Sequence, residues 1–178
     1  MVFISGEKID LIPFNLEHKE LYLKWVNDVE IRKNVGYRFP TSSEGINMLF
    51  TYPSNNSRKL AHFEIWHKVD KKSIGTVALF DIDWENRLAT IGYFIGDISF
   101  WGQGIGTETL KLITTYGFNE LNLHKIRADV HSRNIASKRC FEKNKYIMEA
   151  TLIKEEYLDG KYLDLYRFVM FKDQWDEM

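Results

Sequence analysis

The sequence is poor in cysteine and proline and has no excess of either charge. Its 178 residues include one cysteine and three prolines, and 24 basic side chains are balanced by 25 acidic ones, giving a net charge of -1. The lone thiol, Cys140, excludes an internal disulfide and a cysteine-rich metal site, which is typical of a reducing compartment. Because there is no positive excess to hold a phosphate backbone, nucleic acid is not expected as a partner.

Long apolar segments are also missing. No run approaches the roughly 20 apolar residues that a membrane-spanning helix needs, and residues 1–10 lack the basic and then apolar order of a signal peptide. The histidines show no paired spacing of the kind that metal sites use, so we expect no metal. These absences predict a cytoplasmic protein that has no membrane partner.

What remains has the composition of one folded domain. Hydrophobic residues make up 44% of the chain and aromatic residues 15%, so enough apolar area is available to offset the entropy lost on folding. We find no internal repeat, low-complexity tract or linker. Residues 1–178 are therefore expected to form a single domain.

The spacing of apolar residues switches between the periods of helix and strand. The predicted elements, in chain order, are a strand at 8–14, helices near 21–27 and 43–50, strands at 61–66, 74–82 and 89–95, a helix at 107–117, a strand at 125–131, a helix at 134–143, and late strands from 146 with a hairpin turn at Asp159 and Gly160. This order predicts a mixed α/β fold.

A glycine-rich turn joins the strand at 89–95 to the helix that starts at Thr107. It reads Phe100-Trp101-Gly102-Gln103-Gly104-Ile105-Gly106-Thr107. Glycines let consecutive backbone N–H groups point into one concavity, and the helix dipole adds positive charge there, so a pyrophosphate would fit. A tight turn without a ligand is the alternative. The spacing of the glycines by two excludes the common dinucleotide and P-loop patterns.

As a whole, this segment resembles motif A of the GNAT superfamily of N-acetyltransferases, in which a Gln/Arg-x-x-Gly-x-Gly/Ala loop holds the pyrophosphate of coenzyme A. Trp101 replaces the leading Gln/Arg, as in the branch that includes ribosomal-protein alanine and spermidine N-acetyltransferases. Further matches follow in order at residues 89–93, 134–137 and 159–162. The resemblance implies a twisted, mostly antiparallel sheet of about seven strands, splayed at a cofactor slot and flanked by about four helices.

The resemblance also implies acetyl-CoA as the acyl-donor cosubstrate. The strand before the loop would pair its backbone with the pantetheine arm, and the loop would hold the pyrophosphate. The residues assigned to cofactor binding on this basis are Tyr93, Phe94, Ile95, Trp101, Gly102, Gln103, Gly104, Ile105, Gly106, Thr107, Asn134 and Ser137. For Asn134, a helix cap is a second interpretation, and both can hold together.

Two side chains are expected to move protons. Many relatives have a tyrosine where Phe141 stands, so we expect Ser137 to protonate the departing thiolate, unless it only hydrogen-bonds the helix backbone. An alkylammonium acceptor must lose a proton before it attacks. Thr90 stands where relatives often have a glutamate, so Glu156 is the first candidate for the base, Glu64 the second and a water relay the third. Glu156 as a solvated hairpin charge stays open.

The acceptor is expected to be a primary amine that takes the acetyl group directly, on a protein N-terminus, a polyamine or an amino sugar. Tyr37 and Arg38 follow the early helix, where relatives gate the acceptor site, and together with Glu64 they are expected to contact the substrate. The alternative is a non-catalytic module that senses acetyl-CoA or an amine with the same fold, since the usual tyrosine and glutamate are missing. The likeness also implies a homodimer.

Overall fold

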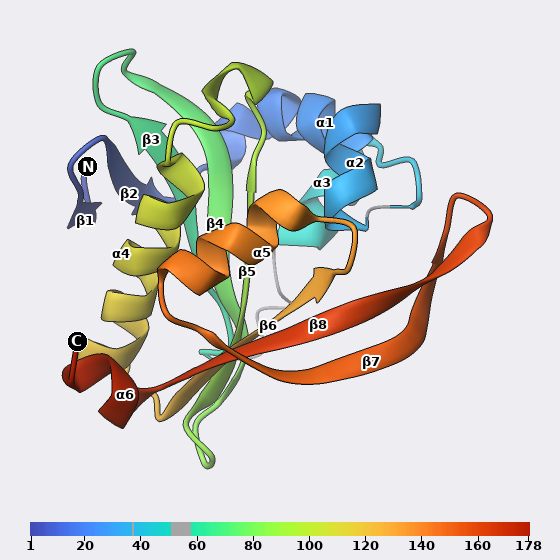
Figure 1. The fold of residues 1–178 in the computed structure, drawn as a ribbon. Helices are drawn as coiled ribbons and strands as arrows, with labels where there is room; N and C mark the ends of the chain where they lie inside the picture. Colours follow the sequence, from blue (N-terminus) through green and yellow to red (C-terminus); the bar gives the residue numbers. More distant parts are fainter. Residues whose placement is uncertain (37, 51–57) are drawn as a thin grey trace.

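A single eight-stranded sheet organises the molecule (Figure 1). The computed structural model describes residues 1–36, 38–50 and 58–178, with side chains for all of these except 47–50. In the described parts of the chain the sheet order is β1-β2-β3-β4-β5-β6-β8-β7, and the one parallel pair is β5 with β6. The strands are β1 (Ile4–Ser5), β2 (Ile9–Pro13), β3 (Ala61–His67), β4 (Lys72–Asp83), β5 (Leu88–Ile95), β6 (Lys125–His131), β7 (Ile147–Leu158) and β8 (Lys161–Phe171).

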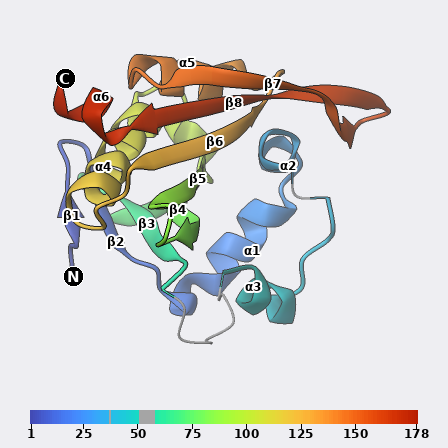
Figure 2. The ribbon, with the colours of Figure 1, turned by 90° about the horizontal axis from the view of Figure 1, so that it is seen from below.

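Helices cover both faces of this sheet, and Figure 2 shows α1, α2 and α3 on one side with α4 and α5 on the other. The larger apolar core lies between the sheet and α4 and α5, and a smaller core joins α1, α2 and α3 to Phe94 of β5. The helices are α1 (Lys19–Asn27), α2 (Val29–Val35), α3 (Ser43–Phe50), α4 (Ile105–Asn119), α5 (Ile135–Lys143) and α6 (Lys172–Asp176), with short 3-10 turns at Leu16–His18 and Ile98–Phe100.

The two central strands, β5 and β6, separate part-way along their length. They pair only at the start, where Leu88, Ala89 and Thr90 lie beside Lys125, Ile126 and Arg127. Beyond Thr90, β5 continues to pair with β4, while β6 continues to pair with β8. The gap opens where β5 leads into the glycine loop, which confirms the predicted splayed slot.

The mixed α/β fold and the mostly antiparallel sheet are confirmed, and the structure adds elements that the pattern did not predict. The eighth strand is β1, whose two residues are too few to show a period. The short helix α2 is bounded by Asp28, whose side chain accepts hydrogen bonds from the N–H groups of Glu30 and Ile31, and by Gly36 in the left-handed conformation. The helix α4 begins at Ile105, slightly before the predicted start at Thr107.

Two classes of feature are not found among the residues that the structure describes. None of the helices in these parts of the chain is long and apolar enough to cross a membrane. The same residues bring together no group of three or more His, Cys, Asp or Glu side chains that could hold a metal ion. The cytoplasmic location and the absence of a metal stay predictions from the sequence.

Candidate active site

The glycine loop leads directly into the first turn of α4. Gly104 is the N-cap of this helix with φ 84°, and it leaves the first amide groups without a side-chain cap. Such groups have no partner inside the helix, so an anion can accept their hydrogen bonds. A Cβ on Gly102 would meet nothing within 4 Å, and one on Gly104 would have only Lys8 Nζ, at 3.8 Å. The residues present therefore fit a diphosphate.

The side chains of the loop hold its shape. The Trp101 indole donates a hydrogen bond to the Ile95 carbonyl at 2.9 Å, and the Gln103 amide donates to the Ser99 carbonyl at 2.8 Å. From the β1–β2 turn, Lys8 Nζ donates to the Gln103 carbonyl at 3.0 Å. Sequence reasoning missed Lys8, because it lies far from the loop in the chain and no local pattern connects the two. Its ammonium adds positive charge where an anion would bind.

The outer half of β5 presents backbone groups to the gap between β5 and β6. The Gly96 N–H donates to Ile74 of β4 at 2.8 Å. Because successive strand residues direct their backbone groups to opposite neighbours, those of Tyr93 and Ile95 face away from β4. The Trp101 indole donates a hydrogen bond to the Ile95 carbonyl. Among the described residues, both backbone groups of Tyr93 and the N–H of Ile95 are then left without a hydrogen-bond partner. An extended ligand chain can pair with such an edge.

Two predicted cofactor residues direct their side chains into the cores. Phe94 is 8% exposed and packs edge-to-face on Trp25, with ring centroids 6.1 Å apart. Its backbone faces Thr76 of β4, so Phe94 does not present hydrogen-bonding groups to the gap. Ile105 is 2% exposed and belongs to the larger core. Ile105 can therefore contribute to ligand binding only through its amide at the start of α4.

Hydroxyl groups gather on the α5 side of the gap. The Ser137 side chain of α5 is near enough to the Tyr93 hydroxyl to act on its pKa, which burial raises well above its usual value and Ser137 acts to lower. A Cβ on Gly106 would lie 3.3 Å from that hydroxyl and 3.2 Å from Cys140 Sγ, so only glycine fits without movement. Phe141 is 2% exposed and belongs to the larger core. The proton donors that this side offers are thus Ser137 and Tyr93.

Asn134 caps α5. Its side-chain oxygen accepts a hydrogen bond from the Ser137 N–H at 3.0 Å, and its amide donates to the Asn34 carbonyl of α2 at 3.3 Å. Of the two interpretations from the sequence, the structure therefore shows the cap. By fixing the first turn of α5, Asn134 also fixes the position of Ser137.

A compact cluster of charged groups lies on the α2 side of the gap. Glu156 of β7 places Oε2 3.1 Å from Arg38 Nη2 and 3.0 Å from His131 Nε2 at the end of β6. The Glu156 side chain is 29% exposed. Arg38 and Glu156, predicted separately for acceptor binding and proton transfer, are thus in contact. His131 was missed, because its strand pattern gives no sign of its partner.

The surroundings of His131 favour the neutral imidazole. Burial lowers the pKa of His131 below its usual value, and the charges of Arg133 and Arg38 act in the same direction, against the opposing effect of Glu156. His131 is 8% exposed. At neutral pH the ring is therefore uncharged and able to accept a proton.

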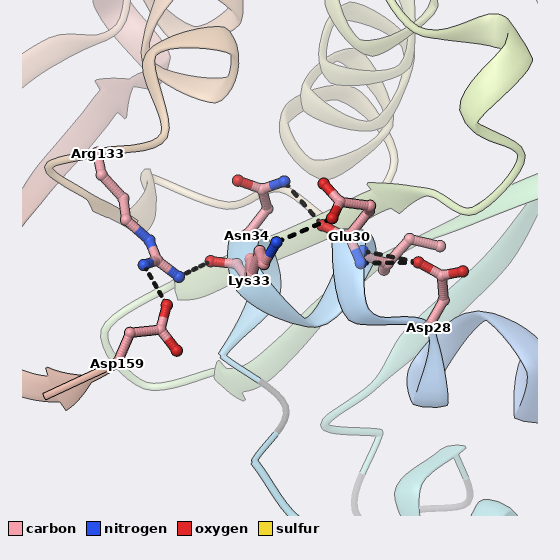
Figure 3. A network of polar contacts seen from close by, with 7 residues as sticks. Asp28, Glu30, Lys33, Asn34, Arg133 and Asp159 are labelled. Carbon is pink, nitrogen blue, oxygen red and sulfur yellow. Dashed lines mark hydrogen bonds and ion pairs between the residues drawn. The ribbon is translucent and has the colours of Figure 1, made fainter.

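Arg133 connects the end of α2 to the β7–β8 turn (Figure 3). Its guanidinium donates to the Lys33 carbonyl at the end of α2 and, at 2.8 Å, to Asp159 in the β7–β8 turn. This contact lowers the pKa of Asp159. Asp28 caps the other end of α2 (Figure 3). The end of α2 and the late hairpin are thus fixed around the Glu156 cluster.

The other two predicted substrate residues do not join this cluster in the structure. Glu64 has no exposed surface, and its carboxylate bonds His18 Nδ1 and the Asn15 N–H, each at 3.0 Å. A fully enclosed carboxylate cannot contact an acceptor, so the expected substrate role of Glu64 is replaced by a structural one that ties the start of α1 to β3. Tyr37 lies outside the described residues.

Comparisons with known proteins give the family. The acetyltransferase (GNAT) domain profile matches residues 8–147. N-acetyltransferase p20 of Bacillus licheniformis, described as uncharacterized, is 29% identical over 98% of this chain and 99% of its own length. The probable N-acetyltransferase YjcK of Bacillus subtilis is 40% identical over 58% of this chain and 57% of that protein. The spermidine N(1)-acetyltransferase of Escherichia coli K12 is 29% identical over 60% of this chain and 56% of that protein.

Solved structures share the fold. Spermidine N-acetyltransferase from Vibrio cholerae, in complex with CoA and spermine, superimposes with a TM-score of 0.86 at 21% identity, over 96% of this chain and 99% of that one. The ribosomal L7/L12 alpha-N-protein acetyltransferase RimL, in complex with coenzyme A, gives a TM-score of 0.82 at 21% identity, over 98% and 99%. Because the family profile covers most of the sequence, the chain belongs to the GNAT family of N-acetyltransferases, and acetyl-CoA is its acyl donor.

Proposed function

We propose that this chain transfers an acetyl group directly to a primary amine, without a covalent enzyme intermediate. The observation that carries the proposal is the arrangement around the β5–β6 gap, with hydroxyl groups on one side and a carboxylate cluster on the other. A proton donor and a proton-accepting cluster on opposite sides of one slot are what amine acylation requires. A module that only senses its ligand would need neither.

The donor side of the slot is assigned to the glycine loop and to β5. When bound, acetyl-CoA supplies an activated acyl carbon and a thiol leaving group. The amide groups at the start of α4 and Lys8 would hold its diphosphate, while the backbone edge at Tyr93 and Ile95 would hold its extended arm. Ser137 would protonate the thiolate, with the Tyr93 hydroxyl close to it on the same side of the slot.

The acceptor side is assigned to Glu156 and the groups around it. The Glu156 carboxylate favours the approach of an ammonium by charge attraction, and as a base it can accept the proton that the ammonium must lose. Arg38 holds Glu156 in place through the contact at 3.1 Å. The cluster mixes both signs of charge, so it is compatible with a peptide N-terminus, a polyamine or an amino sugar. Relatives named for spermidine and for ribosomal proteins make the first two the acceptors to test first.

The test is a thiol-release assay with acetyl-CoA and a panel that contains spermidine, an amino sugar and a short peptide with a free N-terminus. We expect turnover with at least one amine. Ser137→Ala should lower kcat by about tenfold or more, whereas its affinity for coenzyme A, measured by calorimetry, should stay within about twofold because the loop is unchanged. Failure of the wild-type chain to bind coenzyme A would refute the proposal.

We also propose a homodimer through the late hairpin. The β7–β8 hairpin extends beyond the rest of the sheet (Figure 1). It carries exposed apolar side chains, among them Ile153 at 75%, Tyr157 at 53% and Tyr162 at 64%. Exposed apolar surface of this kind is typical of contact with another chain. Light scattering should report twice the mass of one chain, and a monomer at micromolar concentration would contradict the proposal.

A further inference from the structure

Arg127 lies where β5 and β6 separate, on the acceptor side of the sheet. It forms the last β5–β6 pair with Thr90. Every second residue of β6 belongs to the larger core, namely Ile126, Ala128 and Val130. Because strand residues alternate between the two faces of a sheet, Arg127 and His131 project from the opposite face. The turn after α2 lies on that face, since a Cβ on Gly36 would be 3.4 Å from His131 Nε2.

The guanidinium of Arg127 reaches across the base of the gap to β5. Its Nε donates a hydrogen bond to the Thr90 hydroxyl at 3.2 Å. Its two terminal nitrogens have neither a hydrogen bond nor an ion pair with any residue that the structure describes. The residue is partly exposed, and neither terminal nitrogen is fully enclosed, in contrast to Nε of Arg32. A ligand on this face can therefore reach them.

Neighbouring cations are neutralised by carboxylates, whereas Arg127 is not. Lys125 of β6 pairs with Glu149, and Arg167 of β8 donates from two nitrogens to the two oxygens of Asp129, each at 2.8 Å. Arg127 has only a neutral hydroxyl as its partner among the described residues. An arginine keeps its proton inside a folded protein, so Arg127 carries an uncompensated charge that is partly removed from water. Such a charge is costly, and an anionic ligand would offset the cost.

A single carboxylate matches this arrangement. With Nε bonded to Thr90, the planar guanidinium keeps its terminal N–H groups for the two oxygens of one carboxylate. One unpaired cation balances the one negative charge of that group, whereas a diphosphate carries more than one. A polyamine would instead bring a second ammonium towards the guanidinium, and like charges that face each other repel.

We propose that the acceptor is a primary amine that carries a carboxylate, and that Arg127 binds this carboxylate while the amine lies at the Glu156 cluster. The inference rests on the proposed function and deepens it, because it chooses among amines. His131, which lies beside Glu156, is four residues further along β6, about 13 Å at the usual rise of a strand. A peptide N-terminus with an acidic side chain among its first few residues spans this length.

The test compares acceptors that differ in one carboxylate. Short peptides with a free N-terminus and one glutamate near it are assayed beside their glutamine counterparts, free amino acids beside their amides, and spermidine by itself. For the wild type, kcat/KM should be about 30-fold higher for the best carboxylate acceptor than for its amide counterpart. In Arg127→Gln this ratio should fall to less than about threefold through a higher KM for the carboxylate acceptor, while KM for acetyl-CoA stays within about twofold.

Arg139→Gln is the matched control, since it makes the same change on the exposed face of α5, and it should keep the wild-type ratio. Equal kcat/KM for carboxylate and amide acceptors in the wild type, or a higher value for spermidine than for either, would overturn the inference and leave the proposed function intact. A preference that survives Arg127→Gln would also overturn it, because another group would then bind the carboxylate. Absence of turnover with every amine would overturn the proposed function itself.

A second measurement needs no turnover. Binding of the best carboxylate acceptor in the presence of coenzyme A should raise the melting temperature of the wild type, and the same concentration should leave that of Arg127→Gln unchanged. An equal rise in both would overturn the inference. Arg127→Lys keeps the charge and loses the planar fork, so its preference for the carboxylate should fall to about fivefold. This variant supplies the comparison if Arg127→Gln proves too unstable to assay, and a full 30-fold preference in it would contradict binding by the fork.

Discussion

At the scale of single residues, burial separates two carboxylates that look alike in the sequence. Glu64 and Glu156 both lie on strands and were both candidates for the acceptor site. Glu64 is enclosed and bonded to His18 and Asn15, whereas Glu156 is partly exposed beside Arg38. Side-chain type and strand position cannot distinguish these environments, because the partners come from remote parts of the chain.

Replacing Glu64 should therefore affect stability and spare the reaction. Glu64→Gln removes a buried charge that holds the start of α1, so we expect the free energy of unfolding to fall by about 2 kcal/mol. KM for the amine should be unchanged at temperatures where the variant is folded. Urea denaturation and steady-state kinetics measure the two effects, and an increase in KM without loss of stability would return Glu64 to the acceptor site.

His131 should make stability depend on pH below neutrality. Its pKa is lowered in the folded state by burial and by the two arginines, so the unfolded chain binds more protons than the folded chain as pH falls through about 6.5. The contribution of the neutral His131 to the free energy of unfolding is then fully present above that pH and is lost progressively below it. In His131→Asn this contribution to the dependence of the free energy of unfolding on pH should disappear. Urea denaturation at a series of pH values measures that dependence. An unchanged slope would contradict the lowered pKa.

At the scale of elements, the glycine loop is the part of the site that the sequence predicts best. Its function depends on backbone geometry, and glycines at Gly102, Gly104 and Gly106 signal that geometry directly. The remaining contacts could not be predicted in this way. Lys8 reaches the loop from the first turn, and His131 meets Glu156 only because β6 and β7 flank β8. The short helix α2 had caps at both ends but too few residues for a clear period.

The loop can be tested with a matched pair of glycines. Gly104 and Gly160 both have positive φ, at 84° and 78°, and both have room for a Cβ. Each change to alanine should cost about 1 kcal/mol of stability, because a side chain disfavours this conformation. Only Gly104→Ala should weaken the binding of coenzyme A in calorimetry, by about tenfold, since Gly160 lies in the β7–β8 turn on the acceptor side and does not belong to the glycine loop. Equal affinities of the two variants would contradict the role of the loop.

The contact between α2 and the late hairpin should organise the acceptor side. Arg133→Gln removes the hydrogen bonds to Lys33 and Asp159, so amide hydrogen exchange in α2 should become faster and KM for the amine should rise. Arg139→Gln, on the exposed face of α5, is the control and should change neither. Unchanged exchange in Arg133→Gln would show that α2 is held by its apolar contacts alone.

At the scale of the whole molecule, the separation of β5 from β6 places the groups that would bind the acyl donor and the groups that would bind the acceptor in one slot. The backbone edge of β5 and the start of α4 serve the donor, hydroxyl groups lie towards α5, and the Glu156 cluster lies towards α2. The alternating pattern predicted the strands, but the divergence arises from β6 pairing with β8 while β5 stays with β4. Such long-range pairing leaves no local signal in the sequence.

The most direct test of this account is a crystal structure of the chain with acetyl-CoA. We predict that the diphosphate lies against the amide groups of residues 105–107, that the extended arm pairs with Tyr93, and that the acetyl group ends between Ser137 and the His131–Glu156 pair. A cofactor bound elsewhere, or an acetyl group on the far side of β5 from these residues, would contradict it.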